Sequence, residues 1–258
     1  MLLLRVSHLS VILGSYAILR AEATARDYDI SDRILMIISF STAGFGPMVS
    51  NYKVGQISPL IYLAIAGCWY WYRQDKDLPA GAALAFTVLT KPYFLAPAAV
   101  LIARKRFKGV IGVIGGTLAG YGIGLAVFGI DTLYRYFWYL EQGSVGKEGS
   151  NVPDVTAWSV ETVYPFFSFS LLSGLGRLLA FAGFSSLWIQ YLRAGTQTRD
   201  GVGVFSGSLV MVMFIIQQAS NMDLAVCLAA YLVLGPELYD RGWGFKWLGL
   251  SFILLTIH

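Results

Sequence analysis

The chain alternates long apolar runs with short polar segments. The apolar runs cover residues 1–19, 34–49, 57–72, 109–128, 166–192, 202–219, 222–238 and 245–257. A helix crosses a bilayer with about 20 apolar residues, at a rise of about 1.5 Å per residue. The pattern therefore predicts an all-α fold, a polytopic transmembrane bundle with about 8 membrane spans.

Residues 80–103 depart from this pattern, because basic residues flank them on both sides and a charge interrupts them. A single crossing would place one basic flank outside, whereas basic loops favour the cytoplasm. We predict a re-entrant hairpin with arms at residues 80–89 and 94–103 and with Lys91-Pro92 at its tip. Each arm of about ten residues would be about 15 Å long, so the tip would lie near the bilayer midplane or slightly beyond it.

Lys91 is the unusual residue of this hairpin. An ammonium group in mid-bilayer costs at least a few kcal/mol, and Pro92 removes a backbone donor and forces a break. Broken helices with a charge at membrane depth occur where protein buries them or where they line a wet cavity. The functional interpretation is that Lys91 meets a phosphate or another anion. The alternative is a lysine that extends to one interface from a kinked helix.

Basic loops fix the expected orientation. The segments 20–33, 73–77, 104–108, 193–200 and 240–246 hold most of the 19 lysine and arginine residues, so we expect them in the cytoplasm of a multi-pass protein of the cell membrane. The outer face then receives a polar loop with Asn51, Lys53 and Gln56, a segment at 129–165, and polar residues at 217–223. Residues 130–141 predict a short aromatic helix lying in the interface. The whole chain, 1–258, reads as a single transmembrane domain.

Composition agrees with a membrane protein, since 56% of the residues are hydrophobic and 13% are charged, against roughly 25% charged in soluble domains. The net charge of +4 is a topology signal and does not indicate nucleic-acid binding. Cys68 and Cys227 lie in apolar runs and are expected as free thiols. His8 and His258 are at opposite ends of the chain, so no metal site and no cofactor is expected.

The order of features from Asn51 to Tyr139 resembles glycosyltransferase family 87, a group of integral-membrane enzymes with the GT-C fold. These features are Gly55-Gln56, an apolar helix, a short charged loop, Ala80-Gly81, Lys91-Pro92-Tyr93, a basic cluster, a glycine-rich span, and Phe128-Gly129 before an aromatic helix. The likeness extends more loosely through residues 157–159 to 221–223.

The resemblance implies a sugar transferase. Such enzymes take a sugar, typically mannose, from a polyprenyl-phosphate carrier and pass it to a lipid-linked or glycan acceptor on the extracytoplasmic side. The partners would therefore be this donor, the acceptor and membrane lipids. Gly55 and Gln56 would lie at the outer mouth of the site, and Lys91 with Tyr93 near the carrier phosphate.

The family pattern also has an acidic residue, the expected base, in a large loop after its first helix. A carboxylate there would deprotonate the acceptor hydroxyl. We expect the chain to lack this loop. Three explanations stay open: the chain is a fragment, a partner chain supplies the region, or the base lies elsewhere. The substitutes in the sequence are Asp27, Asp29, Asp131, Asp154, Glu161 and Asp223. The sequence assigns none of them as the catalytic residue.

Two other function classes remain open. The chain could be a non-catalytic, GT-C-like subunit that binds the lipid carrier and needs a catalytic partner. It could also be a small transporter whose broken helix binds substrate at the midplane, although no second Lys-Pro break repeats in an inverted position.

Overall fold

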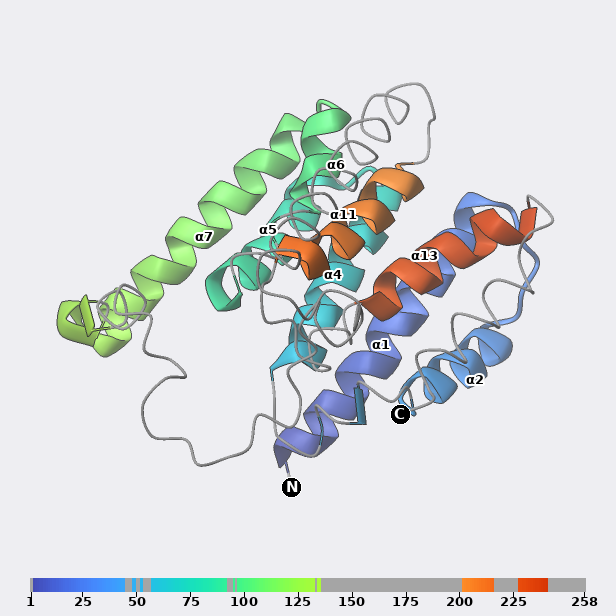
Figure 1. Cartoon of the computed structure of the whole chain (residues 1–258), viewed down its shortest axis with the longest axis horizontal. Helices are drawn as coiled ribbons and strands as arrows, with labels where there is room; N and C mark the ends of the chain where they lie inside the picture. The colour runs from blue at the N-terminus through green and yellow to red at the C-terminus, as the bar shows by residue number, and fades with distance from the viewer. Residues whose placement is uncertain are drawn as a thin grey trace, which may run out of the picture.

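The computed structural model describes residues 2–44, 48–49, 52, 57–91, 95, 97–132, 134–135, 201–215 and 227–240. Its helices are α1 (Leu2–Ala25), α2 (Asp32–Thr42), α4 (Ser58–Arg73), α5 (Asp77–Thr90), α6 (Ala98–Ala103), α7 (Phe107–Phe128), α11 (Val202–Ile215) and α13 (Cys227–Asp240) (Figure 1). No strand occurs among the described residues, so the all-α prediction is confirmed for this part of the chain.

The central helices agree closely with the sequence prediction. α4 and α7 each begin and end within one or two residues of the predicted 57–72 and 109–128, and α11 begins at Val202 as predicted. Residues 166–192 and 245–257 lie outside the described residues. Only a few residues of the predicted interfacial helix at 130–141 are described, and these are helical.

Three predicted boundaries were wrong. α1 continues through the expected polar loop to Ala25, because Glu22 is buried and bonded there. α2 ends at Thr42, short of Val49, so that it is about 16 Å long. α5 begins at Asp77 because Pro79 fits the first helical turn, where backbone N–H groups have no partner within the helix.

The second arm of the hairpin is also shorter than predicted. Its α-helix begins at Ala98, after Pro97 in the capping position. Proline fixes its own φ and leaves no N–H for a preceding helical turn. α6 therefore has 6 residues, while α5 with its 14 residues is about 20 Å long rather than the expected 15 Å.

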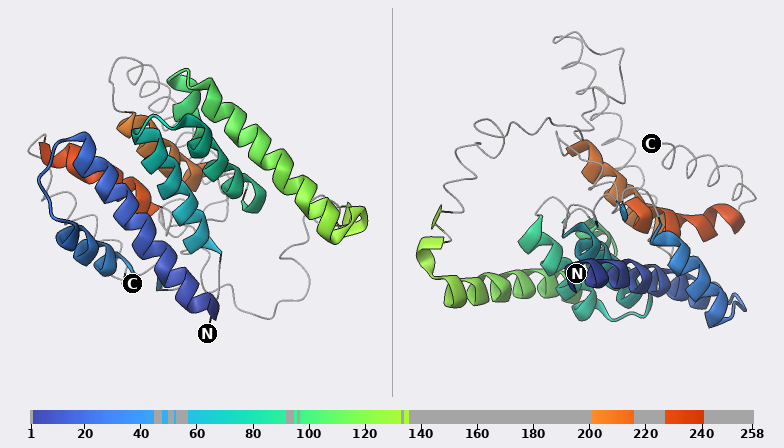
Figure 2. Two further views of the ribbon diagram at one scale, coloured as in Figure 1. Left: turned by 180° about the vertical axis from the view of Figure 1, so that it is seen from behind. Right: turned by 90° about the horizontal axis from the view of Figure 1, so that it is seen from below.

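The helices form two layers. α2, α1, α4, α5 and α7 lie side by side in that order, each packed on its neighbour, and α11 and α13 lie on one side of this row (Figures 1 and 2). α4 is the central helix, and its Ile61, Tyr62, Ile65 and Trp69 side chains are completely buried. α4 therefore separates the N-terminal helices α1 and α2 from the pair formed by α5 and α7.

Glycines allow α5 and α7 to approach closely. A Cβ atom at Gly81 would overlap the carbonyl of Gly109, and one at Gly112 would overlap the carbonyl of Leu78. At Gly116 it would meet the Cβ of Ala85 at 2.6 Å. The backbones themselves are therefore in contact, as expected for small residues between membrane helices. The glycines of α7 therefore serve close helix packing against α5.

Three helices end with the same hydrogen-bonded turn. In each turn, a backbone N–H donates to the carbonyl five residues before it. These bonds run from Tyr28 to Ala23, from Lys76 to Trp71 and from Arg106 to Leu101, and they are 2.8–2.9 Å long. The residue before each donor has a positive φ: 54° at Asp27, 58° at Asp75 and 54° at Lys105. This is the Schellman motif, in which the left-handed position is usually glycine. It satisfies the last carbonyls of α1, α4 and α6.

Arg106 joins two of these turns. Its Nη1 donates to the Tyr72 carbonyl at 3.1 Å and to Asp77 at 2.9 Å, and Nη2 lies 2.7 Å from Asp75. Its guanidinium also lies 4.2 Å from the centre of the Tyr72 ring. Burial acts to lower the pKa of Arg106, whereas Asp77, Tyr72 and Asp75 raise it, and the net pKa lies above the ordinary value. Arg106 therefore holds the turn after α6 against the start of α5, while the re-entrant course through the membrane stays a prediction.

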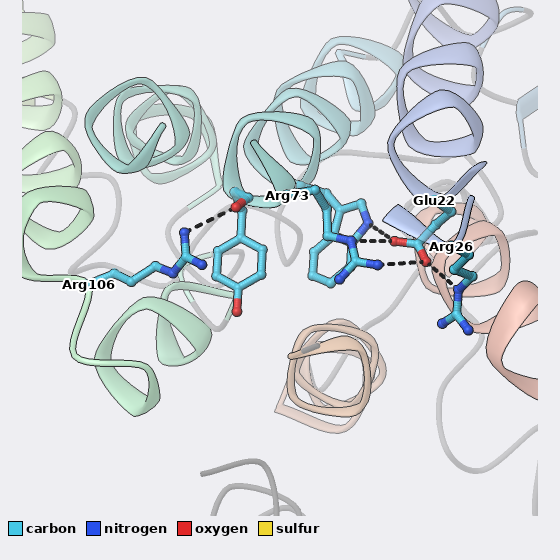
Figure 3. A network of polar contacts seen from close by, with 6 residues as sticks. Glu22, Arg26, Arg73 and Arg106 are labelled. Carbon is cyan, nitrogen blue, oxygen red and sulfur yellow. Dashed lines mark hydrogen bonds and ion pairs between the residues drawn. The ribbon is translucent and has the colours of Figure 1, made fainter. Parts of the chain in front are cut away.

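Glu22 forms a second polar junction at this end (Figure 3). Its side chain is 1% exposed, accepts a hydrogen bond from Trp69 Nε1 at 2.9 Å, and pairs with both Arg26 and Arg73 at 3.1 Å. Trp69 packs on Phe205 of α11 with ring centres 4.5 Å apart. We call this end of the bundle, with the α1, α4 and α6 C-termini and the α5 and α7 N-termini, the basic end.

α7 is, among the described residues, the one helix that is both long and apolar enough to cross a membrane. Only 11% of its apolar window is buried within the protein. α1 has the length, but Arg5, Arg20 and Glu22 lie within it. The other described helices are shorter than a span, so about 8 crossings stays a prediction for the whole chain.

Gly81→Ala is expected to destabilise the protein. The new methyl group would press on the Gly109 carbonyl, which is backbone and cannot rotate away. Overpacking of this kind typically costs about 1–3 kcal/mol. The measurement is the thermal unfolding midpoint of the purified protein in detergent.

Gly115→Ala on α7 is the matched control, because a Cβ there meets nothing within 4 Å. Alanine in an exposed helix position is favoured over glycine by about 0.5–1 kcal/mol, so its midpoint should be unchanged or slightly higher. Equal midpoints for the two variants would contradict the close contact of α5 and α7.

Glu22→Gln is expected to lower the free energy of unfolding by about 3–5 kcal/mol, because it leaves two half-buried arginines facing a neutral group. The control is Asp32→Asn, which breaks the Arg20–Asp32 pair, whose side chains are 45% and 60% exposed. An exposed pair contributes at most about 1 kcal/mol. Denaturant unfolding measures both variants. Similar losses in the free energy of unfolding would contradict a larger contribution from the buried Glu22 pairs.

Candidate functional site

The α5 helix ends at Thr90, directly before the Lys91-Pro92 break that the sequence predicts. Proline disfavours helical geometry in the preceding residue, and Lys91 before Pro92 has the extended dihedrals φ −143° and ψ 91°. Its N–H still donates to the Thr87 carbonyl at 2.7 Å. Lys91 is therefore the first residue beyond the helix, and the predicted break is confirmed at this position.

Threonine hydroxyls complete the last turn of α5. Thr87 Oγ1 donates to the Leu84 carbonyl at 2.7 Å. Thr90 Oγ1 contacts the carbonyls of Phe86 and Thr87 at 3.0 and 3.1 Å. Both hydroxyls thus donate to carbonyls one turn back along α5, a common arrangement of threonine side chains in helices. Lys91, a half-buried residue, follows this turn directly.

The register against α7 gives the level of Lys91 in the bundle. The Leu89 side chain lies over Gly120, which follows the first α7 residue, Phe107, by about 20 Å of helix. α7 continues past this level to Phe128, roughly another 12 Å. Lys91 is therefore about two-thirds of the way along α7 from the basic end.

The start of α4, which follows the predicted outer loop in sequence, lies at the same end as Lys91. α4 and α5 are antiparallel neighbours joined by a short turn, so the start of α4 at Ser58 lies near the level where α5 ends. Asn51, Lys53, Gln56 and Tyr93 themselves lie outside the described residues, as do Gly55 and Pro92. Their assignment stays a prediction.

A stacked pair marks the beginning of this loop. The imidazole of His8 lies 3.8 Å from the ring of Tyr52, with 27° between the planes. His8 Nδ1 is 2.8 Å from the Leu4 carbonyl and donates to it. The pair attaches the loop after α2 to the first turns of α1. Sequence reasoning missed it, because residues far apart in the chain with no common motif give no signal.

The carboxylate candidates divide between the two ends. Asp27 and Asp29 follow α1 and lie at the basic end, away from Lys91. Asp131 follows α7 at the opposite end and is exposed. Asp154, Glu161 and Asp223 lie outside the described residues. Of the described candidates, only Asp131 is therefore on the Lys91 side of the bundle.

Glu22 is the polar residue that sequence reasoning missed most clearly. It was assigned to a solvated loop, whereas it is a buried junction between α1 and α4. The spacing of Glu22 and Arg26, four residues apart, was the available signal, since such pairs face each other on a helix. Its position at the basic end makes it a structural residue of the bundle.

Comparisons with known proteins give one result. No curated protein matches the chain, and no solved structure matches it. The model of glycosyltransferase family 87 matches residues 1–236, a wider region than the motifs between Asn51 and Tyr139 that carry the resemblance. Because this match covers most of the chain, the protein belongs to glycosyltransferase family 87.

Proposed function

We propose that the protein transfers a sugar, most simply mannose, from a polyprenyl-phosphate carrier to a lipid-linked or glycan acceptor on the extracytoplasmic face. Family membership implies glycosyltransferase activity. The donor, the sugar, the acceptor and the multi-pass orientation are parts of the proposal. The observation that carries it is the place of Lys91 at a helix break inside the bundle.

The depth of Lys91 is the first supporting argument. If α7 crosses a hydrocarbon core of about 30 Å from the basic end, Lys91 lies about 20 Å deep, roughly 5 Å beyond the midplane. An ammonium group at that depth costs at least a few kcal/mol unless an anion or water accompanies it. A lipid phosphate is an anion that the membrane itself can deliver to this site.

The anchoring of the broken segment is the second argument. Arg106 holds the beginning of α5 and the end of the α6 turn at the basic end. The glycine contacts then fix α5 against α7. The tip of the hairpin is therefore held at a constant depth, which a phosphate-binding residue needs in order to position the carrier for reaction.

The alternative of a carrier-binding subunit that needs a catalytic partner also has an observation in its favour. Of the described carboxylates among the candidate bases, only Asp131 lies on the Lys91 side, and it is about 15 Å further along the axis. A base could come from Asp131 after a rearrangement, from another part of the chain, or from a partner. The same assay separates these functions.

Lys91→Ala is expected to lower sugar transfer at least about 100-fold, as loss of one charged donor at a transferred group typically does. The assay measures radiolabelled mannose moved from polyprenyl-phosphate-mannose to a membrane lipid extract by purified protein in lipid. Lys91→Arg should retain part of the activity, because it keeps the charge. Lys76→Ala, an exposed lysine at the other end of α5, is the control and should be fully active.

Two outcomes would change the proposal. Full activity of Lys91→Ala would remove Lys91 from the site. No transfer by the wild-type protein, with the carrier lipid still bound in a Lys91-dependent manner, would identify the chain as the carrier-binding part of a larger enzyme.

A further inference from the structure

The turn between α6 and α7 carries more positive charge than the protein neutralises. Arg106 is paired with Asp75 and Asp77. Arg104, Lys105 and Lys108 make no ion pair with any residue that the structure describes, and both lysines are exposed. Three cations thus gather within one short turn at the basic end.

Arg104 gives this charge a specific geometry. Its Nε and Nη2 atoms are buried and have no hydrogen-bond partner among the described residues. A buried charged donor without a partner is costly, so no described residue compensates the charge of Arg104. The third guanidinium nitrogen, Nη1, is not among these buried atoms, and a guanidinium N–H is a strong donor to a phosphate oxygen.

An exposed apolar stripe begins directly beside the three cations. Phe107, Ile111, Ile114 and Leu118 follow each other at spacings of four, three and four residues, which places them on one face of α7. Their side chains are 64%, 61%, 56% and 67% exposed. The opposite face of α7 packs on α5 through its glycines. The stripe is therefore free to contact hydrocarbon chains along the length of α7.

We propose that the α6–α7 turn binds one anionic phospholipid. Arg104, Lys105 and Lys108 hold its phosphate, and the acyl chains lie along the stripe of α7. Cationic pockets at the ends of membrane helices recognise anionic headgroups in this way. The site requires α7 to cross the bilayer, as the proposed function also does, but it lies about 20 Å from Lys91 and is separate from the site of the carrier phosphate.

The consequence is a fixed depth for the hairpin. A lipid held at the α6–α7 turn sits next to Arg106, which ties this turn to α4 and α5. It would hold the basic end at the headgroup level, and Lys91 would then stay at its depth in the bilayer.

Native mass spectrometry of the full chain tests the proposal. The protein is equilibrated in micelles with phosphatidylglycerol or with phosphatidylcholine of the same acyl chains, and the first bound lipid is counted. We expect wild type to bind phosphatidylglycerol at least about tenfold more tightly, because its headgroup is a net anion, whereas the choline ammonium of phosphatidylcholine offsets the phosphate charge that the three cations would bind. Arg104→Gln should remove most of this preference.

Arg33→Gln is the matched control, because it removes one exposed positive charge from α2, at a distance from the turn. It should keep the preference. Equal binding of the two lipids by wild type would overturn the proposal, and so would equal losses in Arg33→Gln and Arg104→Gln, which would indicate a diffuse attraction. If inorganic phosphate competed as strongly as phosphatidylglycerol, the ligand of this turn would be a free anion, and the lipid proposal would be overturned.

Lys108→Gln keeps the test decisive if Arg104→Gln does not fold. Its exposed side chain can be changed without a core contact, and we expect a loss of about threefold in preference. No change in this variant would exclude Lys108 from the site. Because lipid binding is counted without any sugar transfer, failure of this proposal and failure of the proposed transferase activity are distinguishable.

Discussion

The guanidinium of Arg106 holds together the ends of α4, α5 and α6. It binds the Tyr72 carbonyl and Asp77, and so it closes the segment that leaves the basic end in α5 and returns in α6. Tyr72 in turn stacks on Trp69, whose indole N–H donates to Glu22. One continuous row of charged and aromatic contacts therefore connects the start of α7 to the end of α1.

The two ends of the bundle differ in the charge of the side-chain pairs that they contain. At the basic end, Glu22, Asp75 and Asp77 all pair with arginines, so these three carboxylates are neutralised within the protein. At the other end, the pairs that the structure describes are neutral, such as the His8–Tyr52 stack.

The sequence predicts the parts of the fold that depend on local pattern. α4 and α7 could be placed because apolar runs of helix length are bounded by charges, and the end of α5 because Pro92 acts on the residue before it. Local signals of this kind need no knowledge of the partner. The contacts of Gly81, Gly109 and Gly112 between α5 and α7 join residues far apart in the sequence, and no local pattern pairs these helices.

The rest depends on contacts between distant residues. The extension of α1 to Ala25 follows from Glu22 meeting Trp69 and Arg73 on α4, and a polar run at positions 20–33 gives no sign of it. The separation of Asp27 from Lys91 follows likewise from the order of the helices. Only the break at Lys91, the one site residue that the structure describes, was predictable from sequence.

The position of Lys91 bears on the proposed function. Lys91 is the first residue beyond α5, because Pro92 disfavours helical geometry in the residue before it. A polar, neutral residue could occupy that position at a lower cost in the bilayer than an ammonium group. The proposed function accounts for the charge, since a lipid-borne phosphate is an anion that an ammonium group at this depth can bind.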